Sequence, residues 1–265
     1  MRAFEYHRPS STKEALALGK KDEARYLAGG QSLVQAMKLR LSSPSDLIDL
    51  SSLKDLVGIK AAGSTVEIGA MTRHADVAGS KEVQKAIPAL AALAGIIGDR
   101  QVRHMGTIGG SLANSDPAAD YPAAVLGLGA TIVTSKRKIE ADKYFKGLFE
   151  TALEPGELIA AVSFPVPKRA AYMKFKNPAS RFALVGVFVA DFGGESVRVA
   201  VTGAGPCAFR QAEMEKALAA KFAPESVANI KVKADGLNND LHASPEYRAH
   251  LITVMAKRAV EAALK

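Results

Sequence analysis

Two short segments rich in glycine carry the clearest chemical signal in this 265-residue sequence. The first is Ala28-Gly29-Gly30-Gln31-Ser32-Leu33, and the second is Gly106-Thr107-Ile108-Gly109-Gly110-Ser111-Leu112-Ala113-Asn114. Paired glycines reach positive φ angles and let a ligand approach the backbone without a Cβ in the way. Successive N–H groups in such a segment can point at an anion, so the predicted partner is an oxygen-rich ligand such as a diphosphate.

Neither segment has either of the two common phosphate-binding fingerprints, G-x-G-x-x-G or G-x-x-x-x-G-K-[ST]. A single pair of glycines is more often a tight turn than a ligand site. Here two pairs occur, each followed by a serine and an apolar residue. On the residues alone, a turn and a ligand site are therefore about equally good interpretations.

Other residue types that commonly do chemistry form no comparable pattern. The five histidines lack the spacing of a zinc site, and no G-x-S-x-G elbow is present. The sole cysteine, Cys207, can neither form an internal disulfide nor supply the ligands of an iron–sulfur cluster. Asp116 and Asp120 would suit acid–base or magnesium chemistry, but aspartates beside prolines more often cap turns, which we favour. We expect no metal site on this chain.

Composition excludes some classes of protein. The chain is 48% hydrophobic and 23% charged, which is typical of a soluble globular protein. No apolar run approaches the ~20 residues of a membrane span, and the start lacks a signal-peptide pattern, so a cytoplasmic location is expected. The net charge of +8 would suit nucleic acid, an anionic cofactor or an acidic partner. The basic residues are scattered, and the densest run, at 136–138, lies in a predicted turn, so nucleic-acid binding is not favoured.

The elements around the glycine segments follow from hydrophobic spacing and turn residues. A capping box predicts a helix from about Thr12, and a strand over 25–28 leads through the first glycine pair into another helix. A short strand is predicted over 46–50, a hairpin across Gly63-Ser64, and helix over 82–97 that Pro88 either interrupts or kinks. The segment 106–122 is predicted to be an ordered loop.

With the elements of its second half, the sequence predicts an α+β fold in two domains. Strands at 130–133 and 158–164 end at a pair of prolines, which marks the boundary between domains 1–167 and 168–265. In the second, an antiparallel pair at 183–192 and 196–202 precedes helices at 209–221 and 245–264, the last one capped by Ser244.

The motifs together resemble the flavin subunits of the molybdenum hydroxylases, the family of carbon monoxide dehydrogenase and xanthine dehydrogenase. The resemblance rests on both glycine segments and on Gln101-Val102-Arg103, Asp116-Pro117-Ala118-Ala119-Asp120, Phe4-Glu5-Tyr6 and Gly156-Glu157-Leu158-Ile159. It covers nearly the whole chain, although Gln35 stands where many relatives carry proline. It implies a two-part FAD-binding region of the vanillyl-alcohol-oxidase (PCMH) type, with subdomains of about 1–55 and 56–167, and a smaller C-terminal domain with a three-stranded sheet.

The resemblance also implies the residues that bind FAD. The two glycine segments cradle the diphosphate, Asp120 holds adenosine-side or ribityl hydroxyls, and Ile159 meets the adenine region. Lys176 lies near the flavin, and Phe182 is the candidate for the aromatic residue beside the isoalloxazine ring. The complete expected set is Leu27, Ala28, Gly29, Gly30, Gln31, Ser32, Leu33, Val102, Thr107, Ile108, Gly109, Gly110, Ser111, Asp120, Ile159, Lys176 and Phe182.

The implied function is electron transfer inside a complex. In this family a large subunit hydroxylates the substrate at a molybdopterin centre, and two [2Fe–2S] clusters on a small iron–sulfur subunit pass the electrons to FAD. The implied assembly is a dimer of heterotrimers, with no indispensable acid–base residue on this chain. Two alternatives stay open: a stand-alone FAD oxidoreductase of the same fold and a basic nucleic-acid-binding protein.

Overall fold

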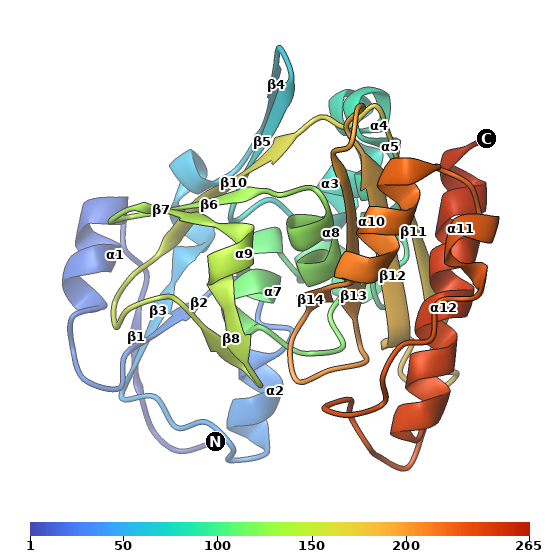
Figure 1. The fold of residues 1–265 in the computed structure, drawn as a ribbon. Helices are drawn as coiled ribbons and strands as arrows, with labels where there is room; N and C mark the ends of the chain where they lie inside the picture. Colours follow the sequence, from blue (N-terminus) through green and yellow to red (C-terminus); the bar gives the residue numbers. More distant parts are fainter.

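The N-terminal part of the computed structural model, which describes residues 1–265, is a small parallel sheet with helices beside it (Figure 1). Strand β3 lies between β1 and β2 and runs parallel to both. As predicted, the Ser11 hydroxyl caps the first helix by accepting from the N–H of Glu14. The elements are β1 (Glu5–His7), α1 (Thr12–Leu18), β2 (Arg25–Leu27), α2 (Leu33–Lys38), β3 (Asp46–Asp49) and 3-10 turns at Leu50–Ser52 and Lys54–Leu56.

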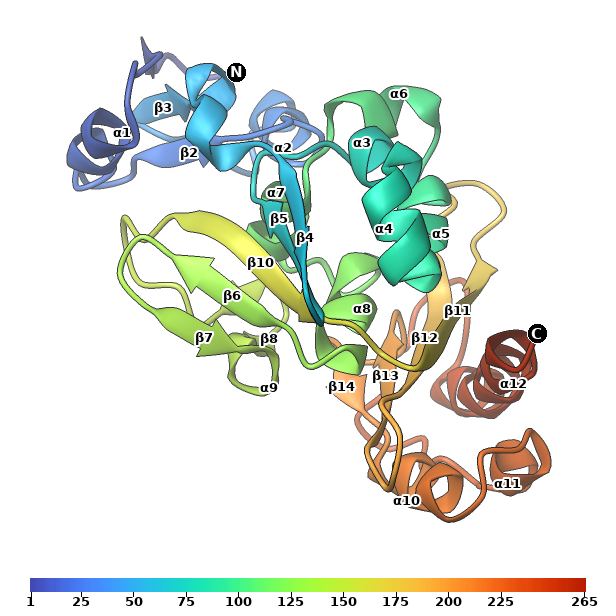
Figure 2. The same ribbon diagram turned by 90° about the horizontal axis from the view of Figure 1, so that it is seen from above.

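The middle part is a five-stranded antiparallel sheet of order β4-β5-β10-β6-β7. The predicted hairpin at Gly63 is present, and Pro88 opens a second helix instead of kinking the first. Helix α8 lies between this sheet and the C-terminal sheet (Figure 2). The elements are β4 (Ile59–Ala62), β5 (Thr65–Gly69), α3 (His74–Gly79), α4 (Lys81–Ala86), α5 (Pro88–Gly95), α6 (Arg100–Met105), α7 (Ile108–Asn114), α8 (Tyr121–Gly127), β6 (Thr131–Thr134), β7 (Lys138–Glu140), α9 (Ala141–Tyr144), β8 (Phe145–Gly147), β9 (Glu150–Thr151) and β10 (Ile159–Pro165).

The segment 106–122 is largely helical, so the prediction of a loop was wrong. Glycine disfavours a helix by about 1 kcal/mol relative to alanine, which is why the sequence indicated a loop. In the folded chain, however, Ile108 and Leu112 on α7 are completely buried. A Cβ on Gly109 would lie only 2.5 Å from the Cβ of Ala70, so only glycine lets the helix pack this closely. Tertiary packing therefore outweighs the local preference.

The C-terminal part is an antiparallel meander of order β11-β12-β13-β14. Every residue of β12 is buried, because α12 covers one face of the sheet and α8 the other. The predicted hairpin at 193–194 and the Ser244 cap are present, but residues 209–210 form a short fourth strand where a helix was predicted. The elements are β11 (Arg169–Lys176), β12 (Ala183–Asp191), β13 (Val197–Thr202), β14 (Phe209–Arg210), α10 (Ala212–Ala220), α11 (Glu225–Ala228) and α12 (Pro245–Ala263).

One face of this sheet shares its core with the middle part of the molecule. Tyr172, Phe188 and Ala200 belong to the same buried cluster as Leu90 and Tyr121. The opposite face packs on α10 and α12 in a second core. The division after residue 167 stays a prediction, since the C-terminal sheet is packed firmly on the preceding helices. No helix combines the length and the apolar character that crossing a bilayer requires.

Candidate functional site

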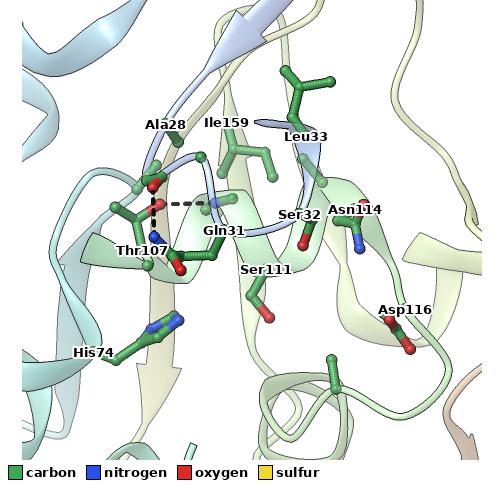
Figure 3. A pocket seen from close by; sticks show the side chains of 18 of the residues that line it. Ala28, Gln31, Ser32, Leu33, His74, Thr107, Ser111, Asn114, Asp116 and Ile159 are labelled. Atoms are coloured by element: carbon green, nitrogen blue, oxygen red, sulfur yellow. Dashed lines mark hydrogen bonds between the residues drawn. The ribbon is translucent and has the colours of Figure 1, made fainter. Parts of the chain in front are cut away.

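Both glycine segments line one cavity of about 400 Å³. Its walls come from all parts of the chain: the loop after β2, the helices α6 and α7, the start of β10 and the turn before β12. Figure 3 shows side chains from the loop after β2, from α7 and from the start of β10 around the same space. The fold thus brings together stretches that lie more than a hundred residues apart in the sequence.

The two glycine segments touch each other directly. A Cβ on Gly29 would lie 2.1 Å from the carbonyl oxygen of Met105 and 2.7 Å from the Cα of Gly106. Gly30 has a φ of +71°, a conformation that residues with a side chain rarely adopt. The absence of side chains is therefore required here for two different reasons: close approach at Gly29 and backbone conformation at Gly30.

The first segment presents a row of free hydrogen-bond donors. No backbone N–H from Gly29 to Ser32 has an acceptor within the chain. The Gln31 side chain closes this turn by donating to the carbonyl of Gly29 at 3.3 Å. Backbone donors facing a cavity need a partner, and consecutive N–H groups in a turn form a concave site for an anion.

The second segment differs, because the N–H groups around its glycine pair already have partners, although that of Thr107 has none. Ile108 donates to the carbonyl of Thr72 at 3.1 Å and Gly109 to that of Ala70 at 2.8 Å. Gly110 donates to the Thr107 hydroxyl at 3.1 Å, as drawn in Figure 3. This segment therefore offers the cavity mainly a close backbone surface and polar side chains.

Those polar side chains lie around the middle of the cavity. Ser32, Ser111 and Asn114 line it from the first loop and from α7, and Asp116 lies near Asn114 in the same view (Figure 3). One oxygen of Asp116 accepts from the N–H of Ala118 at 2.8 Å, so the favoured turn-capping interpretation holds for this residue. Burial raises the pKa of the Asp116 carboxyl. Hydroxyl, amide and carboxyl groups together suit a ligand rich in hydroxyls and phosphate oxygens.

Asp120 lines the cavity but does not cap a helix. One carboxylate oxygen accepts from the Tyr172 hydroxyl at 2.6 Å and the other from the Lys174 ammonium at 3.0 Å. Burial raises the pKa of Asp120, while Lys174 and Tyr172 oppose that shift. Lys174 also donates to the carbonyl of Ile96 at 3.2 Å, so it ties two walls of the cavity together.

Lys174 was missed by sequence reasoning, which selected Lys176. Alternate residues of a regular strand share a face, and the bulge between these strands leaves β11 regular, because the extra residue is Leu184 of β12. Lys176 is the last residue of β11; it is exposed and does not line the cavity. Nothing in the sequence marks which of the two lysines is buried.

Apolar residues form two parts of the cavity wall. Leu50, Met71 and Leu158 of one buried cluster lie on the wall that also includes Ile159. Just before Leu158, burial acts to raise the pKa of Glu157, but Arg137 and Thr134 outweigh it and lower that pKa to about 2. This carboxylate anchors the strand that carries Ile159.

Ile97, Val102 and Phe182 are further apolar residues that line the cavity. Phe182 is 48% exposed, so it is not a core residue. It comes directly after Arg181, which holds a left-handed φ of +63°. This turn places a ring at the edge of the cavity, where sequence reasoning predicted an aromatic side chain.

A buried histidine also lines the cavity, although sequence reasoning assigned it no role. His74 is 4% exposed, and its Nδ1 has no hydrogen-bond partner. Burial, followed by the charge of Arg103, lowers its pKa to about 4. A single histidine at the start of a helix carries no signal in the sequence that could have identified it.

The structure brings most of the expected FAD residues together. Leu27, Ile108 and Lys176 do not line the cavity: Ile108 is buried in the core, Leu27 packs beneath Gly30, and Lys176 faces outward. Lining residues from the expected set are Ala28, Gly29, Gly30, Gln31, Ser32, Leu33, Val102, Thr107, Gly109, Gly110, Ser111, Asp120, Ile159 and Phe182. The role of each one toward FAD stays a prediction.

Comparison with known families gives two matches that together span nearly the whole chain. Residues 2–167 match the FAD binding domain in molybdopterin dehydrogenase. Residues 170–263 match the CO dehydrogenase flavoprotein C-terminal domain. These matches confirm the predicted family and the predicted fold.

Individual relatives agree along the full length. The carbon monoxide dehydrogenase medium chain of Afipia carboxidovorans is 37% identical, covering 98% of this chain and 96% of the relative. The glyceraldehyde dehydrogenase medium chain of Sulfolobus acidocaldarius is 36% identical, covering 97% and 96%. Among solved structures, reconstituted CO dehydrogenase from Oligotropha carboxidovorans has a TM-score of 0.92 at 36% identity, covering 99% of this chain and 98% of that one.

Proposed function

Because the chain belongs to the flavoprotein family of the molybdopterin dehydrogenases, we propose that it carries FAD as the electron-transfer subunit of a multi-subunit molybdenum hydroxylase. The observation that carries this proposal is the row of N–H groups from Gly29 to Ser32, which have no acceptor within the chain and belong to residues that line the cavity. A diphosphate is the part of FAD that such a row of donors would bind.

The remaining lining residues fit the other parts of FAD. Ser111, Asn114 and Asp116 supply polar groups for sugar and ribityl hydroxyls. The apolar wall near Ile159 suits the flat adenine, and the wall formed by Ile97, Val102 and Phe182 suits the larger flavin ring. Two apolar surfaces separated by a polar middle are what a dinucleotide of this kind requires.

When bound, FAD would supply chemistry that accepts electrons singly and delivers them in pairs. The chain itself holds and orients the cofactor. Gly29 to Ser32 would bind the diphosphate, and Phe182 would cover the ring. The buried Lys174 bridges Asp120 and Ile96, and so keeps the cavity walls at a fixed separation. No residue of the chain needs to transfer a proton for this function.

Electrons would enter from outside the chain. Ile96, Met105 and Phe182 are apolar, are 45–48% exposed, and each lies at or next to a lining residue. An apolar rim of this kind would allow a partner to approach closely. The proposed partners are a small iron–sulfur subunit and a large molybdenum subunit, arranged as a dimer of heterotrimers, and an external acceptor would take the electrons from FAD.

The proposal is tested by co-expressing this chain with the proteins encoded beside it and purifying through a tag on this chain. FAD, iron and molybdenum should elute in one peak, and flavin reduction by substrate should require the iron–sulfur partner. The net charge of +8 predicts that association with an acidic partner slows as salt is raised. Hydroxylase activity in a fraction that lacks this chain would contradict the proposal.

The two alternatives give different results in the same preparation. A stand-alone FAD oxidoreductase would turn over a small substrate as a purified single chain. A nucleic-acid-binding protein would retain DNA or RNA on a filter at low salt and lose it at moderate salt. Release of FMN instead of FAD on denaturation would also contradict the cofactor assignment.

A further inference from the structure

Two buried polar groups beside the cavity have no hydrogen-bond partner. They are Nδ1 of His74 and the hydroxyl of Tyr121, and their rings lie 5.3 Å apart. Tyr121 is completely buried and His74 is 4% exposed. A polar atom left without a partner in the interior lowers the free energy of unfolding by about 1–3 kcal/mol. A polar ring that is kept here despite this loss of stability points to a role other than folding.

The backbone fixes the His74 ring against the second glycine segment. The N–H of His74 donates to the carbonyl of Gly106 at 2.9 Å. A Cβ on Gly106 would lie 2.6 Å from Nε2 of His74, so a glycine is required where the ring packs. Because Nδ1 is enclosed, Nε2 is the nitrogen open to the cavity, and Figure 3 shows the ring directed into it.

The surroundings of His74 indicate which part of FAD would lie beside it. Gly106 lies between His74 and Gly29, so the free N–H groups that would bind the diphosphate are on the far side of that glycine. On its own side, His74 is next to α6, because its Nε2 and the carbonyl oxygen of Val102 both lie beside Gly106, and Val102 also lines the cavity. His74 therefore faces the α6 side of the cavity, which we assign to the flavin ring.

We propose that Nε2 of His74 forms a hydrogen bond with a polar edge atom of the isoalloxazine ring, which makes His74 an FAD-binding residue. This inference rests on the proposed function. A neutral imidazole offers one donor and one acceptor, and the flavin ring presents nitrogen and oxygen atoms along one edge. The low pKa of His74 is consistent with this, since it keeps the ring neutral at physiological pH.

The test uses the full chain with its flavin removed and FAD added back. His74→Phe keeps an aromatic ring of similar size and loses both nitrogens. It should bind FAD about tenfold more weakly, the effect of losing one hydrogen bond to a buried group. The flavin midpoint potential and absorption bands should shift as well. The matched control is His104→Phe, because His104 is exposed on α6, and it should leave the affinity within about twofold of wild type.

A second measurement needs no variant and covers the case in which His74→Phe does not fold. The wild-type chain with ¹⁵N-labelled histidine contains five rings, and His74 is the one that is buried with a lowered pKa. Addition of FAD should shift its Nε2 resonance. An unchanged resonance, or wild-type affinity and potential in a folded His74→Phe, would overturn the inference. Failure of the wild-type chain to bind FAD would instead contradict the proposed function.

Discussion

Replacing Gly29 with alanine separates the two glycine segments by a defined distance. The new Cβ would lie 2.1 Å from the Met105 carbonyl oxygen and 2.7 Å from the Gly106 Cα. Non-bonded heavy atoms prefer separations of about 3.5 Å, so one backbone must move by about 1 Å. Both clashing groups are backbone, and no side-chain rotation can relieve the contact.

The free-energy cost of Gly29→Ala is that of overpacking a closely packed contact, about 1–3 kcal/mol. If the segments part to accommodate the methyl group, that cost appears in FAD binding. Since about 1.4 kcal/mol corresponds to a factor of ten, the dissociation constant should rise about 5- to 150-fold. A fluorescence titration of the flavin-free chain with FAD measures this directly, and thermal unfolding shows how much of the cost falls on stability.

Gly79→Ala is the matched control. A Cβ on Gly79 would have no atom within 4 Å, and this glycine has no positive φ. Its substitution should leave FAD affinity unchanged and raise stability by up to about 1 kcal/mol. If Gly29→Ala binds FAD within twofold of wild type at an unchanged melting temperature, the contact between the two segments is not required for the site.

Three further predictions follow from the site. Phe182→Ala should weaken FAD retention and change flavin fluorescence. Because Phe182 is 48% exposed, the free energy of unfolding should change by only about 0.5 kcal/mol, and a large loss of stability would refute this. Glu157→Gln should lower the free energy of unfolding by about 2–3 kcal/mol at pH 7 in urea titrations. The folded pKa of Glu157 is lowered, so its contribution is present above about pH 4.5 and is lost as the pH falls toward 2; the variant should show a flatter profile in that range. Lys174→Met should destabilise the chain by about 3 kcal/mol, since it leaves the Asp120 carboxylate buried without its cation, whereas exposed Lys176→Met should change stability by less than about 0.5 kcal/mol.

Elements set by neighbouring residues were predictable from the sequence. The Ser11 and Ser244 hydroxyls each cap a helix by bonding an N–H three residues away. The turns at Gly63 and at Gly193-Gly194 have the positive φ angles that glycine permits. These features depend on contacts within a few residues, so the sequence contains everything needed to identify them.

Predictions failed where distant residues decide the local structure. Residues 106–122 read as a loop because of their glycines, but α7 forms since Gly109 fits against Ala70. The helix at 209–221 begins only at Ala212, because Phe209 and Arg210 pair with β13. In each case a partner far along the chain supplies the stabilising contact.

The candidate site also combines features that the sequence determined with features that only the tertiary structure determined. The sequence by itself identified the family, the two glycine segments and most of the lining residues, because close backbone approach restricts those positions to glycine and small residues. Only the tertiary structure decided which amides remain free, that Lys174 and not Lys176 pairs with Asp120, and that His74 faces the cavity. Hydrogen-bond partners and burial depend on where distant segments meet, and a local pattern of residues does not record this.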